Sequence, residues 1–147
     1  MAETQHFGGI YKISQLQNVK IMSLPVSLIV WQDYHWISLF ITTTDLEVMD
    51  SSGLINTQNY SNNLLQFLKV QLRGKNLSIT PKLQSDKSNA CALYAILFLI
   101  YRIATGKSLC DFCKLFTNNP IRNCNIIKDI SRTIWSDNEK LLTLDNC

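Results

Sequence analysis

The stretch "QSDKSNACALYAILFLIY", residues Gln84–Tyr101, decides the fold. Its first half is polar and rich in turn-forming residues, whereas its second half is the longest apolar run in the chain. That run is well short of the ~20 residues that cross a bilayer, so it is typical of a buried helix. Gly106 supplies a stop signal, which predicts a helix over residues 90–105. The sequence therefore predicts a central buried helix with Cys91 in its first turn.

The composition is that of one folded domain. The chain has 147 residues, of which 46% are hydrophobic and 17% charged, so we expect a single domain over residues 1–147. Its N-terminus, "MAETQHFGG", lacks the basic start and apolar stretch of a secretory signal. We therefore expect a protein that acts inside the cell and does not enter a membrane.

Strand-like and helix-like segments follow one another in an order that favours an α+β fold. The expected strands are 26–31, 35–42, 45–50 and 77–80, and the expected helices are 61–74, 90–105, 108–116 and 126–135. Residues 8–16 are expected to form a turn and a short lead-in segment. This order predicts a small mixed or antiparallel sheet packed on helices, with the buried helix carrying a nucleophilic cysteine at its N-terminus.

The cysteines and charges favour neither a metal site nor a nucleic-acid site. Five cysteines at irregular spacing argue against a disulfide framework, and "CDFC" (110–113) has no second pair that would complete a zinc site. Residues 1–60 hold two basic and five acidic side chains, whereas residues 61–147 hold twelve and six. Because no run of Lys or Arg occurs, we expect solvated charge rather than a DNA groove, and no metal or cofactor.

Four residues nevertheless form a candidate catalytic set. A helix N-terminus lowers the pKa of a thiol, which makes Cys91 a candidate nucleophile. Of the two histidines, His35 begins a predicted strand and is the candidate base, whereas His6 lies near the N-terminus. The remaining two roles fall to Asp50, as the group that orients the imidazole, and to Gln84, as a donor to an oxyanion together with the Cys91 N–H.

The position of Asp50 depends on one turn. If the hairpin turns about Thr43 and Thr44, opposed residues have numbers that sum to 87, so His35 faces Ser52 and lies diagonal to Asp50. A three-residue loop would move Asp50 to the other face of the sheet.

These residues resemble the adenovirus-type cysteine proteases, which belong to a wider group that includes the SUMO-specific proteases. The resemblance is carried by "HW" (35–36), by "MDSSG" (49–53) and by "QSDKSNAC" (84–91), and it covers roughly residues 8–106. It implies a triad of Cys91, His35 and Asp50, with Gln84 as oxyanion donor. The acid is Asp, as in the SUMO proteases, rather than the adenoviral Glu, and Ala92 replaces the usual Gly after the nucleophile.

The resemblance implies a cysteine endopeptidase that matures viral structural polyproteins at small residues such as Gly. Three alternatives stay open: a protease that removes ubiquitin-like modifiers, an acyltransferase with the same trio, and an inactive binding module. The expected partner is a protein or polyprotein. No residue matches the DNA and peptide activators of adenoviral enzymes. A viral source would place the enzyme in the host nucleus or cytoplasm and in the virion. The pair "GG" in "FGGI" (7–10) is expected to form a turn rather than a self-cleavage site.

Overall fold

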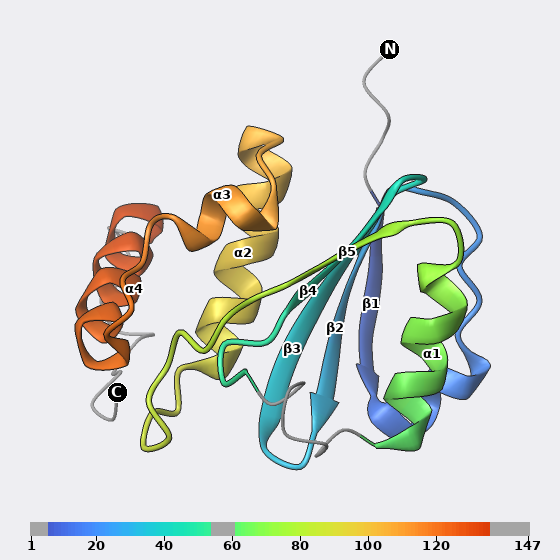
Figure 1. Cartoon of the computed structure of the whole chain (residues 1–147), viewed down its shortest axis with the longest axis horizontal. Coiled ribbons are helices and arrows are strands. Elements are labelled where there is room, and N and C mark those ends of the chain that lie inside the picture. The colour runs from blue at the N-terminus through green and yellow to red at the C-terminus, as the bar shows by residue number, and fades with distance from the viewer. Residues whose placement is uncertain (1–5, 54–60, 136–147) are drawn as a thin grey trace.

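The computed structural model describes residues 6–53 and 61–135, which form a five-stranded sheet with helices on both faces (Figure 1). The strands follow one another across the sheet in chain order: β1 (His6–Lys12), β2 (Val26–Gln32), β3 (His35–Ile41), β4 (Asp45–Met49) and β5 (Asn76–Ile79). The helices are η1 (Ile13–Asn18, a 3₁₀ helix), α1 (Asn62–Leu72), α2 (Cys91–Thr105), α3 (Leu109–Cys113) and α4 (Pro120–Ile134). The predicted α+β fold is confirmed.

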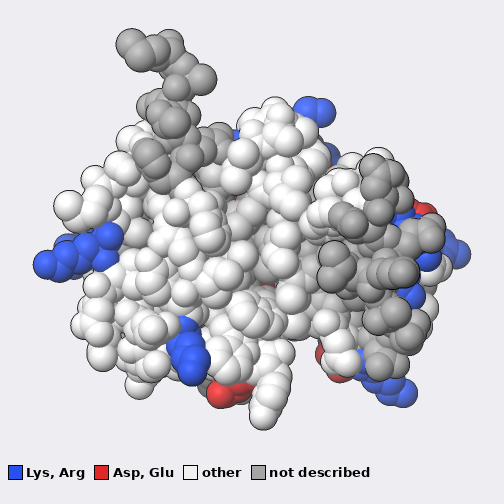
Figure 2. All heavy atoms as spheres, turned by 180° about the vertical axis from the view of Figure 1, so that it is seen from behind, with Lys and Arg blue, Asp and Glu red and all other residues white. Residues whose placement is uncertain are grey.

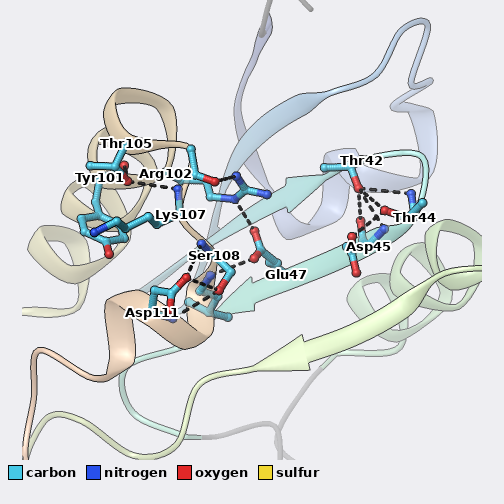
Figure 3. Close-up of polar contacts among 12 residues, drawn as sticks. Thr42, Thr44, Asp45, Glu47, Tyr101, Arg102, Thr105, Lys107, Ser108 and Asp111 are labelled. Carbon is cyan, nitrogen blue, oxygen red and sulfur yellow. Dashed lines mark hydrogen bonds and ion pairs between the residues drawn. The ribbon is translucent and has the colours of Figure 1, made fainter.

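The sheet is mixed, because its central pairs are antiparallel and its outer pairs are parallel. Strand β3 pairs with β4 so that Ser38 faces Met49 and Leu39 faces Val48, which is the register predicted from the sequence. The turn needs no glycine because Thr42 closes it: its hydroxyl accepts hydrogen bonds from Thr44 N (3.2 Å) and Asp45 N (2.9 Å) (Figure 3). Side-chain capping thus fixes the register of the hairpin.

Alternation along the strands builds two cores, one on each face of the sheet. In β2, Leu28 and Val30 pack toward η1 and α1, whereas Ile29 packs toward α2. In β3, Leu39 belongs to the first core and Phe40 to the second. Helix α2 lies between the sheet and the two C-terminal helices, so its apolar residues are covered on more than one side.

A buried carboxylate ties the helices to the sheet. Glu47 of β4 accepts hydrogen bonds from Arg102 Nε and from Leu109 N, both at 2.8 Å (Figure 3). Arg102 is near the end of α2 and Leu109 begins α3, so one carboxylate satisfies both a guanidinium and the N-terminus of a helix. Ser38 of β3 adds a hydrogen bond to the Ala95 carbonyl at 2.9 Å, nearer the start of α2. These contacts fix α2 against β3 and β4.

Two expectations about the chain ends were wrong. Residues 8–16, expected to be a turn, belong to strand β1 and helix η1. The glycines hid the strand: the register with β2 shifts between Phe7 and Gly9, and Gly9 has φ +120°. At the other end, α4 begins at Pro120 rather than near Ile126, because Asn119 caps it and proline is favoured in the first turn.

The expectation of unpaired cysteines was also wrong for one residue. Cys124 of α4 is disulfide-bonded, whereas Cys91, Cys110 and Cys113 are free thiols. The irregular spacing of the cysteines in the sequence gave no sign of this disulfide, because pairing depends on proximity in the fold. Cys147 lies outside the described residues.

In residues 6–53 and 61–135, no helix is both long and apolar enough to cross a membrane. The same residues contain no group of three or more His, Cys, Asp or Glu side chains suited to a metal ion. On the face seen in Figure 2, Lys and Arg side chains lie mostly near the outline, and the middle of that face is largely uncharged. Among the described residues drawn on this face, the Lys and Arg side chains form no continuous band of the kind that follows a nucleic-acid backbone.

Replacing Gly8 by Ala should destabilise the fold by roughly 1–3 kcal/mol, as overpacking does. A Cβ at this position would lie 2.5 Å from Leu28 Cδ2 and 2.7 Å from Val26 Cγ2. Urea unfolding measures the change, with Phe7→Ala as the control because Phe7 is an exposed neighbour. Equal stability of Gly8→Ala and the parent would mean that β1 does not pack on β2 in this way.

Candidate active site

The predicted site residues meet at the end of the sheet where β2 turns into β3, beside the N-terminus of α2 (Figure 1). An open cleft of about 520 Å³ lies there. His35, Gln84 and Cys91 all line it, and Trp31, Tyr34 and Ala92 contribute to its walls. Two segments that are distant in sequence, 31–36 and 84–92, therefore present polar or reactive side chains to one space.

Asp50 holds the imidazole of His35. Its Oδ1 lies 2.7 Å from His35 Nε2, and Asp50 is fully buried. The carboxylate directly follows β4, where Thr80 fixes its backbone: Asp50 N donates to Thr80 Oγ1 (2.7 Å), and that hydroxyl donates to the Asp50 carbonyl (2.9 Å). Ser52 N donates to the same Oδ1 at 3.2 Å. Because Nε2 is engaged by the acid, Nδ1 is the ring nitrogen left to face a reaction partner.

Cys91 is the first residue of α2 and lines the same cleft as His35, whose side chain lowers the pKa of the thiol. The preceding residue, Ala90, provides no side-chain cap, so the first N–H groups of the helix are left for other acceptors. The Cys91 Sγ also lies 3.9 Å from the Tyr34 carbonyl oxygen. Tyr34 points this carbonyl from a tight turn, in which Asp33 and Tyr34 both have positive φ (41° and 66°).

The electrostatics of the pair favour a charged thiolate and imidazolium. Burial alone lowers the pKa of His35, but hydrogen bonds with Asp50 and Cys91 and the charges on both outweigh it and raise the pKa of His35 to about 9. Burial alone raises the pKa of Cys91, but the His35 side chain and the main-chain N–H groups of Trp36 and Ala92 outweigh it, so this pKa falls below its ordinary value. Each partner therefore stabilises the charge of the other.

Gln84 is buried in the wall of the same cleft. Its Oε1 accepts a hydrogen bond from Ser51 Oγ at 2.7 Å, and its Nε2 donates to the Ser88 carbonyl at 3.2 Å. A primary amide has two N–H hydrogens, so one remains for an acceptor in the cleft. This arrangement suits a donor to developing negative charge.

Sequence reasoning missed the groups that contribute through the main chain or through a second contact. The Tyr34 carbonyl and the Trp36 N–H act on Cys91 without any side-chain signature. Ser51 was visible in "MDSSG", as a hydroxyl next to the candidate acid, but nothing in the sequence placed it against Gln84.

The other histidine, His6, opens strand β1. Burial raises the pKa of Cys113 to about 11, which makes that thiol unreactive.

The solved structures that are similar to this chain include two distant likenesses. No family model matches the chain, and no curated protein matches it. Among solved structures, it is similar to the central domain of the uncharacterized Lpg1148 protein from Legionella pneumophila, with a TM-score of 0.47, 13% identity, and coverage of 86% of this chain and 84% of that one. It is also similar to a de-sumoylating protease, with a TM-score of 0.39, 17% identity, and coverage of 82% and 60%. Identities this low say nothing of activity.

Cys91 should be the thiol that iodoacetamide alkylates fastest, and its reaction should persist at mildly acidic pH because its pKa is lowered. His35→Ala removes the hydrogen bond and the positive charge while burial remains, so the pKa of Cys91 should rise. The alkylation rate near pH 6 should then fall by about tenfold for each unit of pKa change, and the rate at high pH should fall much less. Mass spectrometry of the labelled peptides gives these rates. Preferential labelling of Cys110 or Cys113 would contradict the assignment.

Proposed function

We propose that this protein is a cysteine peptidase whose nucleophile is Cys91. The observation that carries the proposal is the imidazole of His35, which lies between a buried carboxylate 2.7 Å away and a thiol at a helix N-terminus. A thiol, a base and an orienting acid in this order are the groups required for acyl transfer through a thioester.

The chemistry follows from the geometry. The Cys91 thiolate attacks the carbonyl carbon of a peptide bond, and the carbonyl oxygen becomes an oxyanion that accepts hydrogen bonds from Gln84 Nε2 and the Cys91 N–H. When the intermediate collapses, the C–N bond breaks and His35 gives its proton to the leaving amine. His35 then takes a proton from water, which attacks the thioester and releases a carboxylic acid and the thiol. Asp50 keeps the imidazole oriented throughout.

The substrate is a protein chain cleaved after a small residue such as Gly, in keeping with the family resemblance of the sequence. Two substrate classes follow from that resemblance: viral structural polyproteins and conjugates of ubiquitin-like modifiers. A panel of Gly-Gly peptides and ubiquitin-like fusions decides between them. Acetyl-coenzyme A in the same panel tests transfer to an amine instead of water, and Cys91→Ala is the control for every reaction.

His35→Ala and Cys91→Ala should abolish turnover, whereas Asp50→Asn should leave a measurable rate. The base moves the proton in each step, but the acid only orients the ring and stabilises its charge. Steady-state kinetics on a cleaved panel substrate measure the three variants, with thermal melting as a check of the fold because Asp50 is buried. An Asp50→Asn enzyme as active as the parent would mean that another group orients His35.

Gln84→Ala should lower kcat by two to three orders of magnitude with little change in KM, because loss of one oxyanion donor costs roughly 3–4 kcal/mol in the transition state. Gln84→Glu should be at least as harmful, since a carboxylate repels the developing negative charge. Cys91 alkylation needs no oxyanion, so its rate serves as the control for an intact site. Values of kcat near that of the parent in both variants would remove Gln84 from the mechanism.

A further inference from the structure

We propose that Ser51 is a positioning residue that holds the Gln84 amide in the orientation needed to donate into the cleft; this inference rests on the proposed function. Ser51 follows Asp50 directly and is 1% exposed. It contacts Gln84 in two ways. Its hydroxyl donates to Gln84 Oε1 at 2.7 Å, and its carbonyl accepts from Gln84 N at 3.0 Å and from Leu83 N at 2.8 Å.

The two ends of a side-chain amide, oxygen and nitrogen, have nearly the same shape, so hydrogen-bond partners decide which end points in which direction. The Ser88 carbonyl can only accept, so the group 3.2 Å from it must be Nε2. Oε1 therefore points toward Ser51, whose hydroxyl must donate. With one hydrogen on the Ser88 carbonyl, the second Nε2 hydrogen is left for the cleft.

Removal of the Ser51 hydroxyl changes this balance. Gln84 is 5% exposed, so its Oε1 would be a buried acceptor without its donor, which is costly. Only the 3.2 Å hydrogen bond to the Ser88 carbonyl would then hold the amide, so the amide would tilt and its second N–H would no longer be aimed into the cleft. An oxyanion donor contributes most when it is already aimed before the reaction, so loss of orientation lowers the rate of chemistry more than it weakens substrate binding.

Ser51 also links the two halves of the site. The chain passes from Asp50, which holds the imidazole, to Ser51, which holds the amide, within a single peptide unit. The base and the oxyanion donor are therefore positioned by the same buried segment after β4. A shift of that segment would displace both groups together.

A double-mutant cycle tests the proposal. Ser51→Ala should lower kcat by about tenfold, the effect of one lost hydrogen bond in a buried site, with KM nearly unchanged. In a Gln84→Ala background the same change should have almost no further effect, because Ser51 acts through Gln84. Ser51→Thr, which keeps the hydroxyl, should restore activity. Equal losses in both backgrounds, or a KM effect alone, would overturn the proposal.

Two controls separate positioning from simple stability. Ser27→Ala removes another buried hydroxyl of the sheet, one whose Oγ has no hydrogen-bond partner among the described residues, and should leave kcat unchanged. The rate of Cys91 alkylation should be the same in Ser51→Ala as in the parent. If Ser51→Ala does not fold, Ser51→Cys keeps the shape with a much weaker donor and should show the same kcat loss.

An NMR measurement distinguishes failure of this inference from failure of the proposed function. The side-chain amide pair of Gln84 is identified by its disappearance in Gln84→Ala. In Ser51→Ala this pair should shift and its protons should exchange faster with water, while Ser27→Ala should leave it unchanged. An unmoved pair overturns the role of Ser51 even if the enzyme is active. If the Gln84 pair shifts in Ser51→Ala but the protein cleaves no panel substrate, the role of Ser51 in orienting Gln84 is supported and the peptidase function is overturned.

Discussion

The register of β3 against β4 places Asp50 beside His35, and the proposed chemistry depends on that contact. Side chains alternate along a strand, so a slip of one residue would turn Asp50 to the opposite face. Thr42 sets the register through its hydrogen bonds to the turn, and Thr80, which directly follows the neighbouring strand β5, holds the backbone of Asp50. The 2.7 Å contact between His35 and Asp50 is thus fixed by the Thr42 turn at the far end of the hairpin and by Thr80 beside β4.

The position of Cys91, the proposed nucleophile, depends on a second constraint, the docking of α2 on the sheet. Ser38 bonds the first turns of the helix to β3, and Glu47 bonds its last turn through Arg102. With both ends of α2 held, its apolar side chains pack at a fixed position along the sheet, and this places Cys91 beside His35. Burial is the largest single effect on the pKa of either group and disfavours both charges, but the combined hydrogen bonds and charges of their neighbours outweigh it: Asp50 and Cys91 act on His35, and His35 with the Trp36 and Ala92 N–H groups acts on Cys91. The pKa shifts of His35 and Cys91 therefore depend on where the two residues lie, since neither residue type would show such a shift on its own.

The central strands, helix α2 and the His35–Asp50 contact could be predicted because each has a local cause: alternation, a continuous apolar run, and a two-residue turn. The sequence could not reveal β1, whose glycines and exposed apolar residues break the pattern of a strand. It also could not reveal the disulfide of Cys124, because pairing depends on proximity in the fold. In the site, side chains of the expected types could be named, but Ser51 and the Tyr34 carbonyl act through contacts between distant segments.

The same limit applies to how much of the chain frames the candidate site. The family resemblance ends near Gly106, yet α4 contacts the loop that carries Gln84. Asn123 of α4 is fully buried, and its Nδ2 donates to the Leu83 carbonyl at 3.0 Å and to the Thr117 carbonyl at 2.9 Å, while its Oδ1 accepts from Thr117 N at 2.7 Å. A buried amide with all these bonds made is rigid. Leu83 immediately precedes Gln84, so the peptide next to the proposed oxyanion donor is held by Ser51 from the turn after β4 and by Asn123 from α4. The segment after the resemblance is therefore part of the frame of the cleft.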